Sequence, residues 1–72
     1  MTFPEVLKSI RKQCNYTQEQ FARELNVSFS TINRWENGRS VPSVLAKIQL
    51  LEYCKRKCID EQIIAELTNF QV

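Results

Sequence analysis

Five side chains between residues 29 and 37 carry groups that can bind the edges of nucleic-acid bases. They recur at offsets of three and four residues, which places them on one side of a helix: Phe29, Ser30, Asn33, Arg34 and Asn37. Arginine can bond guanine in a fork, asparagine can pair with adenine, and an apolar ring can touch a thymine methyl group. The pattern therefore predicts contact with bases in the major groove of double-stranded DNA.

The other side of this helix is apolar and indicates how the helix must sit. Ile32 and Trp35 lie three residues apart and point, together with Val27, toward a core. Ser28 comes directly before the helix and is suited to cap its first amides. Gly38 follows the helix and is free to take a positive φ. The polar side is therefore expected to face solvent.

A second short helix is predicted just before this one. Thr17 begins it, and Gln20 can bond back to the Thr17 amide as a capping box. Its apolar side consists of Phe21, Ala22 and Leu25. Asn26 stands at its end, where a residue that tolerates the left-handed conformation is favoured. Residues 17–38 are thus predicted to be two short helices joined by a tight turn.

This stretch resembles the helix-turn-helix of the lambda-type repressor and Cro family, also called the XRE family. The matching residues are Thr17, Gln18, Glu19, Ala22, Val27, Ile32, Arg34, Trp35, Glu36, Asn37, Gly38, Arg39, Pro42 and Ser43. The resemblance covers roughly residues 7–53. Asn26 stands where the family usually has a turn glycine, a change that asparagine can accommodate. Phe29 replaces a polar base-reading residue, which leaves the preferred DNA sequence open.

The resemblance implies a division of labour on DNA. Gln18 is expected to bond a phosphate and to brace the second helix, while Asn37 and Arg39 hold the DNA backbone on the far side. Helix amides near the start of that helix would also face phosphate. The side chains expected in the major groove are Ser28, Phe29, Ser30, Asn33 and Arg34.

Several of these residues have a second interpretation. Ser28 could serve only as a helix cap, Phe29 could pack on a neighbouring helix or partner, and Arg34 could contact phosphate instead of guanine. The family also implies an ion pair between Arg11 and Glu36, which would lock the first helix to the base-reading helix. The alternative for Arg11 is a solvated surface side chain.

The remaining sequence predicts three more helices. A capping box of Thr2 and Glu5 begins the first, whose apolar face is Val6, Leu7 and Ile10. Ser43 is expected to cap a helix that runs to about residue 56. Its predicted buried stripe is Leu45, Ile48 and Leu51, with Leu50 and Cys54 as further members. The expected fold is all-α, a five-helix lambda-repressor-like domain that spans residues 1–72, with the helix-turn-helix at helices two and three.

The last helix begins at Asp60 and carries four large apolar side chains. These are Ile63, Ile64, Leu67 and Phe70. They could pack against the other helices or form the contact surface of a homodimer, and the spacing does not separate the two interpretations.

Composition excludes several classes of function. The net charge is +2, with all ten Lys and Arg in residues 1–57 and only acidic charges in residues 58–72. Three cysteines without any histidine predict no metal site and no cofactor. No segment approaches the ~20 apolar residues of a membrane span, and no secretory signal is evident, so a cytoplasmic protein is expected.

The sequence is compatible with two functions. The first is a sequence-specific DNA-binding regulator of transcription, with repression favoured over activation. The second is a protein-interaction or antitoxin-type module on the same fold. An enzyme is not expected, since the chain has no histidine, no glycine-rich loop and no paired carboxylates at a plausible cleft.

Overall fold

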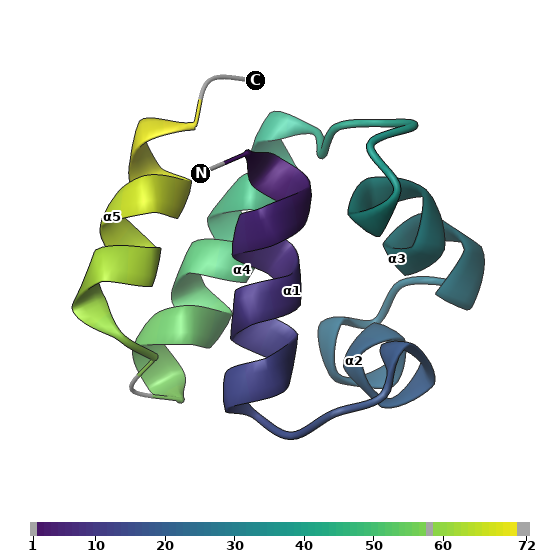
Figure 1. The fold of residues 1–72 in the computed structure, drawn as a ribbon, viewed down its shortest axis with the longest axis horizontal. Helices are drawn as coiled ribbons and strands as arrows, with labels where there is room; N and C mark the ends of the chain where they lie inside the picture. Colours follow the sequence, from purple (N-terminus) through teal and green to yellow (C-terminus); the bar gives the residue numbers. More distant parts are fainter. Residues whose placement is uncertain (1, 58, 71–72) are drawn as a thin grey trace.

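The computed structural model describes residues 2–57 and 59–70 of the 72-residue chain. Within these residues the backbone forms five α-helices and no strand, which confirms the all-α prediction. Their bounds are α1 Phe3–Gln13, α2 Gln18–Leu25, α3 Phe29–Glu36, α4 Val44–Arg56 and α5 Glu61–Asn69. Figure 1 shows α1 in front of α4, with α5 on one side and α2 and α3 on the other. None of the described helices has the length and apolar character needed to cross a membrane.

Each helix begins at a residue whose side-chain oxygen accepts a hydrogen bond from the first turn. Thr2 and Thr17 form complete capping boxes with Glu5 and Gln20, as their spacing predicted. The Thr17 amide donates to Gln20 Oε1 over 2.8 Å, and the Gln20 amide donates to Thr17 Oγ1 over 3.1 Å. The other three helices are capped by Ser28, Ser43 and Asp60. Local sequence therefore determines where the helices start.

The turn between α2 and α3 depends on a left-handed residue. Asn26 has φ 58° and ψ 43°, the conformation expected for it at the end of α2. The next amide, that of Val27, donates to the Ala22 carbonyl over 3.0 Å and closes the helix end. Ser28 then caps α3 directly. Two short helices are thereby joined without a longer loop.

The core draws side chains from every helix. Its buried members are Phe3, Val6, Leu7, Ile10, Phe21, Ala22, Ile32, Trp35, Leu50, Tyr53, Cys54, Ile59 and Leu67. The Phe3 ring meets Trp35 edge-on at a centroid distance of 6.0 Å. The same ring stacks on Phe70 at 4.9 Å. The first turn of α1 therefore joins α3 to the residue that ends α5.

The buried side of α4 differs from the predicted one. Leu45 and Ile48 were expected in the core, and this prediction is wrong because they are 65 % and 46 % exposed. Leu51 is half-buried against the core. The fully buried residues of α4 are Leu50, Tyr53 and Cys54. Apolar residues occur on nearly every side of this helix, so their spacing does not select the side that faces inward. In the structure Tyr53 packs on Phe21, at 6.1 Å between ring centroids.

The apolar side of α5 packs on the core. Leu67 is fully buried, and Ile63, Ile64 and Phe70 are partly buried against the same cluster. The Lys47 ammonium of α4 donates to the carbonyls of Thr68 (3.1 Å) and Phe70. Carbonyls at the end of a helix have no hydrogen-bond donor within the helix, so Lys47 supplies one. Core packing is thus the role that the structure gives to this helix. The homodimer through α5 stays a prediction.

Candidate nucleic-acid interface

The two long sides of α3 lie in different environments. Ile32 is fully buried, Trp35 is 6 % exposed and Glu36 is 2 % exposed. Phe29, which begins the helix, is 50 % exposed. The other predicted base-reading residues on this side are Ser30 and Arg34, which are exposed, and Asn33, which is half-buried. The helix therefore presents a mostly polar ridge to solvent while its apolar side is anchored.

Ser28 shapes the beginning of this ridge. Its Oγ accepts a hydrogen bond from the Thr31 amide over 3.1 Å and lies 2.8 Å from the Thr31 hydroxyl. The capping role of Ser28 is thus present, and Thr31 is a member of the cap that the sequence did not single out. The first amides of a helix have no acceptor within it, so they remain able to face an anion.

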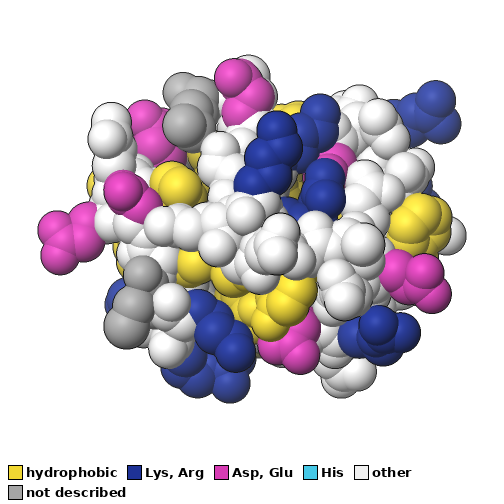
Figure 2. Space-filling view, turned by 60° about the horizontal axis from the view of Figure 1, so that its bottom comes forward, with side chains coloured by type: hydrophobic (Ala, Val, Ile, Leu, Met, Phe, Trp, Pro, Cys, Tyr) yellow, Lys and Arg dark blue, Asp and Glu magenta, His cyan; other side chains and the backbone are white. Residues whose placement is uncertain are grey.

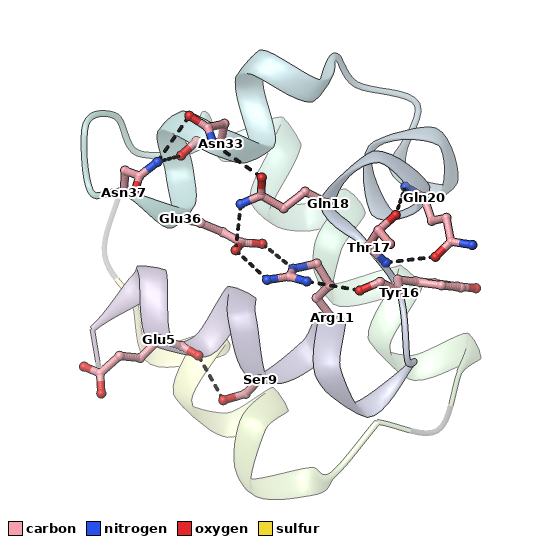
Figure 3. Close-up of polar contacts among 10 residues, drawn as sticks. All are labelled: Glu5, Ser9, Arg11, Tyr16, Thr17, Gln18, Gln20, Asn33, Glu36 and Asn37. Carbon is pink, nitrogen blue, oxygen red and sulfur yellow. Dashed lines mark hydrogen bonds and ion pairs between the residues drawn. The ribbon is translucent and has the colours of Figure 1, made fainter.

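A chain of hydrogen bonds holds α3 against α1 and α2 (Figure 3). Arg11 Nε donates to Glu36 Oε2 over 2.8 Å, and Arg11 Nη2 donates to Glu36 Oε1 over 3.0 Å. Arg11 Nη1 also donates to the Tyr16 carbonyl over 3.1 Å. The ion pair that the family resemblance implied is therefore present. It is bidentate, and it ties both helices to the segment between α1 and α2.

Gln18 links this ion pair to the exposed ridge. Its Nε2 donates to Glu36 Oε1 over 3.1 Å, and its Oε1 accepts from Asn33 Nδ2 over 3.3 Å. Asn33 Oδ1 in turn accepts from Asn37 Nδ2 over 3.2 Å, and Asn37 Nδ2 also donates to the Asn33 carbonyl over 2.8 Å. The bracing role expected of Gln18 is thus visible in the free protein. Sequence spacing alone did not reveal the bond between Gln18 and Asn33.

Two arginines complete the predicted set. Arg34 on α3 and Arg39 beyond it are both exposed, and neither has an ion-pair partner within residues 2–57 and 59–70. The Arg39 amide donates to the Arg34 carbonyl over 2.9 Å, and Gly38 between α3 and Arg39 has φ 70°. Figure 2 shows Lys and Arg side chains in separate groups on one face, with other side chains between them. On this face the basic side chains therefore do not form one continuous patch.

A helix-turn-helix family profile matches residues 7–58, which is most of the chain. The match contains α2, the turn at Asn26, α3 and the polar network described above. This protein belongs to the Cro/C1-type (XRE) helix-turn-helix family. The resemblance to this family, drawn over roughly residues 7–53, is confirmed.

Two curated relatives are similar to this helix-turn-helix protein. Antitoxin HigA-2 from Vibrio cholerae is 42 % identical over 64 residues, which is 89 % of this chain and 61 % of the relative. The HTH-type transcriptional activator BcrR from Enterococcus faecalis is 43 % identical over 44 residues, 61 % of this chain and 22 % of the relative. The chain thus spans less than two thirds of either relative. No solved structure gives a significant match.

Membership of the XRE helix-turn-helix family indicates a DNA-binding protein of the transcription-regulator type. The family and both relatives also point to a protein that is not an enzyme. In the described part of the chain, His, Cys, Asp and Glu side chains do not gather in a group of three or more that could hold a metal ion.

Proposed function

We propose that this protein binds double-stranded DNA sequence-specifically, with α3 in the major groove, and regulates transcription in the cytoplasm. The proposal rests on the observation that α3 has one buried side and one exposed side. Ile32 and Trp35 are buried, whereas Phe29 and Arg34 on the same helix are exposed. A helix with one anchored side and one free polar side can enter a groove without loss of its own packing.

Contacts with phosphate would set the position of α3 on the duplex. The free amides at the start of α3 and the Ser28 hydroxyl lie at one end of the ridge. Asn37 and Arg39 lie at the other end, separated from the first group by the length of the helix. Gln18, which begins α2, can contribute through the free hydrogen of its amide. Two groups of phosphate contacts would therefore flank the bases that α3 reads.

Asn33 is well placed to read adenine. An asparagine amide has two hydrogens and two acceptor lone pairs, and the bonds with Gln18 and Asn37 use one of each. The remaining hydrogen and lone pair match the acceptor N7 and the donor N6 of adenine. The two intramolecular bonds would hold the amide in place before DNA arrives, which lowers the entropic cost of binding.

Arg34 and Phe29 would supply the other base contacts. The Arg34 guanidinium has no competing carboxylate in the described chain, so its fork is free for the O6 and N7 atoms of guanine. Phe29, half-exposed at the start of α3, can contact a thymine methyl group, and Ser30 can accept or donate beside it. A site with adenine, guanine and thymine at neighbouring positions is the expected preference.

Selection of bound sequences from a random duplex pool tests the proposal. We expect one enriched motif, with positions that lose enrichment when Asn33 or Arg34 is replaced by alanine. Lys12→Ala is the matched control, because it removes an exposed positive charge on α1 and should leave the motif unchanged. Recovery of random sequences at every salt concentration would contradict sequence-specific binding. Whether regulation is repression or activation depends on where the motif lies relative to a promoter.

The similarity to antitoxin HigA-2 favours a second candidate function. That similarity extends over 89 % of this chain, beyond the helix-turn-helix itself. An antitoxin would bind and neutralise a toxin protein in addition to any contact with DNA. Expression of the gene that neighbours this one should then arrest growth, and co-expression of this protein should restore it. If co-expression of this protein does not change growth, the antitoxin function is contradicted and DNA binding is the function that is left.

A further inference from the structure

The side-chain amide of Asn33 is connected to a buried carboxylate through a single intermediate residue. Glu36 Oε1 accepts a hydrogen bond from Gln18 Nε2 over 3.1 Å, and Gln18 Oε1 accepts one from Asn33 Nδ2 over 3.3 Å. Figure 3 shows the Gln18 amide between the other two groups. The Glu36 side chain is only 1 % exposed, so it has no access to a bound duplex. A buried charge is thereby linked to the exposed side of α3.

The carboxylate gives this chain of hydrogen bonds a single direction. An ionised carboxylate only accepts hydrogen bonds, whereas an amide side chain accepts at its oxygen and donates at its nitrogen. Glu36 forms a salt bridge with Arg11 and acts as such an acceptor. Gln18 must therefore turn its nitrogen toward Glu36 and its oxygen toward Asn33. Asn33 must in turn present its own nitrogen to Gln18.

The contact of Asn33 with Asn37 agrees with this direction but lies in solvent. Asn37 Nδ2 donates to the Asn33 carbonyl over 2.8 Å and to Asn33 Oδ1 over 3.2 Å. Asn37 is exposed, so water competes for both bonds. Hydrogen bonds are stronger where solvent is excluded, as it is around Glu36. The buried end of the chain is therefore the stronger determinant of how the Asn33 amide is turned.

We propose that Glu36 is a positioning residue that sets the base preference of Asn33. The inference rests on the proposed function, in which Asn33 reads a base in the major groove. Adenine is the base that presents an acceptor, N7, beside a donor, N6; guanine presents two acceptors, thymine an acceptor and a methyl group, and cytosine a donor. An Asn33 amide turned by 180° would exchange its donor and acceptor and mismatch both adenine atoms. Preference for adenine thus requires the direction that Glu36 imposes through Gln18.

Glu36→Gln tests the role of the carboxylate. A carboxamide has one acceptor and one donor group, so it can offer Gln18 either of them and no longer fixes the direction. Loss of enrichment in Asn33→Ala identifies the base pair that Asn33 reads. At this position we expect the wild type to favour A·T by at least about tenfold over the other pairs, and Glu36→Gln by about threefold or less. Competition binding with the selected duplex and its three single-base-pair variants measures both ratios.

Arg11→Lys is the matched control. Lysine lacks the guanidinium fork and weakens the bidentate pair, but it keeps a positive charge beside Glu36 and leaves the carboxylate as an acceptor for Gln18. Its stability should fall while its preference for A·T stays that of the wild type. If Arg11→Lys and Glu36→Gln lose the preference in proportion to their loss of stability, Glu36 acts only by holding α3 in place, and the proposal is wrong. An unchanged preference in Glu36→Gln would overturn it equally.

A second variant covers the case in which Glu36→Gln does not fold. Replacement of a buried ion pair by apolar side chains of similar volume is often neutral or stabilising, so Arg11→Met with Glu36→Met is the variant to use. It removes the acceptor for Gln18 altogether and should lose the preference for A·T as Glu36→Gln does. A preference that persists in this double variant would contradict the role of Glu36. Circular dichroism and thermal unfolding check that each variant is folded.

Nuclear magnetic resonance of the free protein supplies a readout that does not involve DNA. In the wild type, the side-chain amide protons of Gln18 should show stronger Overhauser contacts with the side chain of Glu36 than with that of Asn33. In Glu36→Gln the contacts with residues 36 and 33 should become comparable. Contacts that stay unequal in this variant would overturn the proposed direction of the chain. A wild-type motif without a preference for adenine at the Asn33 position would overturn the inference alone, whereas a random pool without any enriched motif would overturn the proposed function.

Discussion

Glu36 and Arg11 meet in two parallel hydrogen bonds of 2.8 and 3.0 Å, although 25 residues separate them in the chain. The Glu36 side chain is 1 % exposed, whereas Arg11 keeps 20 % of its side chain in solvent. A carboxylate that is buried to this degree depends on its partner for stability. The pair therefore fixes α3 to α1 before any DNA is bound.

Replacement of Arg11 by alanine should destabilise the protein strongly. The change leaves the Glu36 carboxylate buried without its main donor, which costs about 3–5 kcal/mol. Urea unfolding followed by circular dichroism measures the loss. Addition of Glu36→Gln should recover part of it, because a neutral amide tolerates burial better and can still accept the bond from Gln18. Arg23→Ala, on the exposed side of α2, should change stability by less than about 0.5 kcal/mol. Equal losses in the two arginine variants would contradict the anchoring role.

Ile32→Ala should cost about 2–5 kcal/mol of stability, because it leaves a cavity in a fully buried site. Phe29→Ala on the same helix is the control. Its ring is half-exposed, so truncation should cost much less. The comparison of their unfolding free energies measures which side of α3 faces inward. A larger loss for Phe29→Ala would reverse the orientation assigned to this helix.

Arg34→Ala should weaken binding to the selected DNA site by about 1–3 kcal/mol and relax the preference at one base pair. The reason is that a bidentate arginine contact with guanine is lost, while phosphate contacts persist. Gel-shift or filter-binding assays measure the affinity of wild type and variant for the specific duplex and for a random duplex. An equal loss on both duplexes would assign Arg34 to phosphate instead.

Arg39→Ala should weaken binding to every duplex by a similar factor. Loss of one phosphate contact should also reduce the slope of log affinity against log salt by about one. Titrations at several salt concentrations provide this slope. Lys12→Ala serves again as the control for loss of one positive charge. A slope that stays the same in Arg39→Ala would remove this side chain from the phosphate contacts.

The Cys54 thiol should react slowly in the native protein. Burial raises the pKa of Cys54 to about 11 from an ordinary value of 9.0, so little thiolate is present at neutral pH. A variant with Cys14→Ser and Cys58→Ser isolates this thiol for reaction with a maleimide, before and after addition of urea. The pKa of Cys54 is higher in the folded protein than in the unfolded chain. The contribution of this thiol to the free energy of unfolding is therefore complete below pH 9 and is lost as the pH rises toward 11. Cys54→Ala should weaken this loss of stability at alkaline pH. Equal rates of reaction with the maleimide in the native and the urea-unfolded protein would contradict the burial of Cys54.

Features that depend on neighbours in sequence were predictable. The caps at Thr2, Thr17, Ser28 and Ser43 each need an oxygen and an amide within three residues, and all are present. Asn26 was likewise expected in the left-handed conformation that it adopts. The orientation of α3 followed from its clear separation of polar and apolar residues.

Features that depend on how helices cross were not predictable from spacing. The pair of Arg11 with Glu36 was expected only because of the family resemblance. The bond between Gln18 and Asn33 needs the mutual angle of α2 and α3, which sequence spacing does not contain. Leu45 was assigned to the wrong side, since α4 carries apolar residues nearly all round and packing alone selects the inner side. Leu45 and Ile48 both lie on the exposed side of α4.

The position of Trp35 gives this molecule a built-in optical reporter. It is the chain's single tryptophan, it lies on the buried side of α3, and its ring forms an edge-on contact with the Phe3 ring of α1. Emission from its indole should be blue-shifted in the native state and should move to longer wavelength when α3 separates from α1. Local loosening of this one helix, which absorbance or ellipticity would average over all five, can therefore be followed in the unlabelled protein.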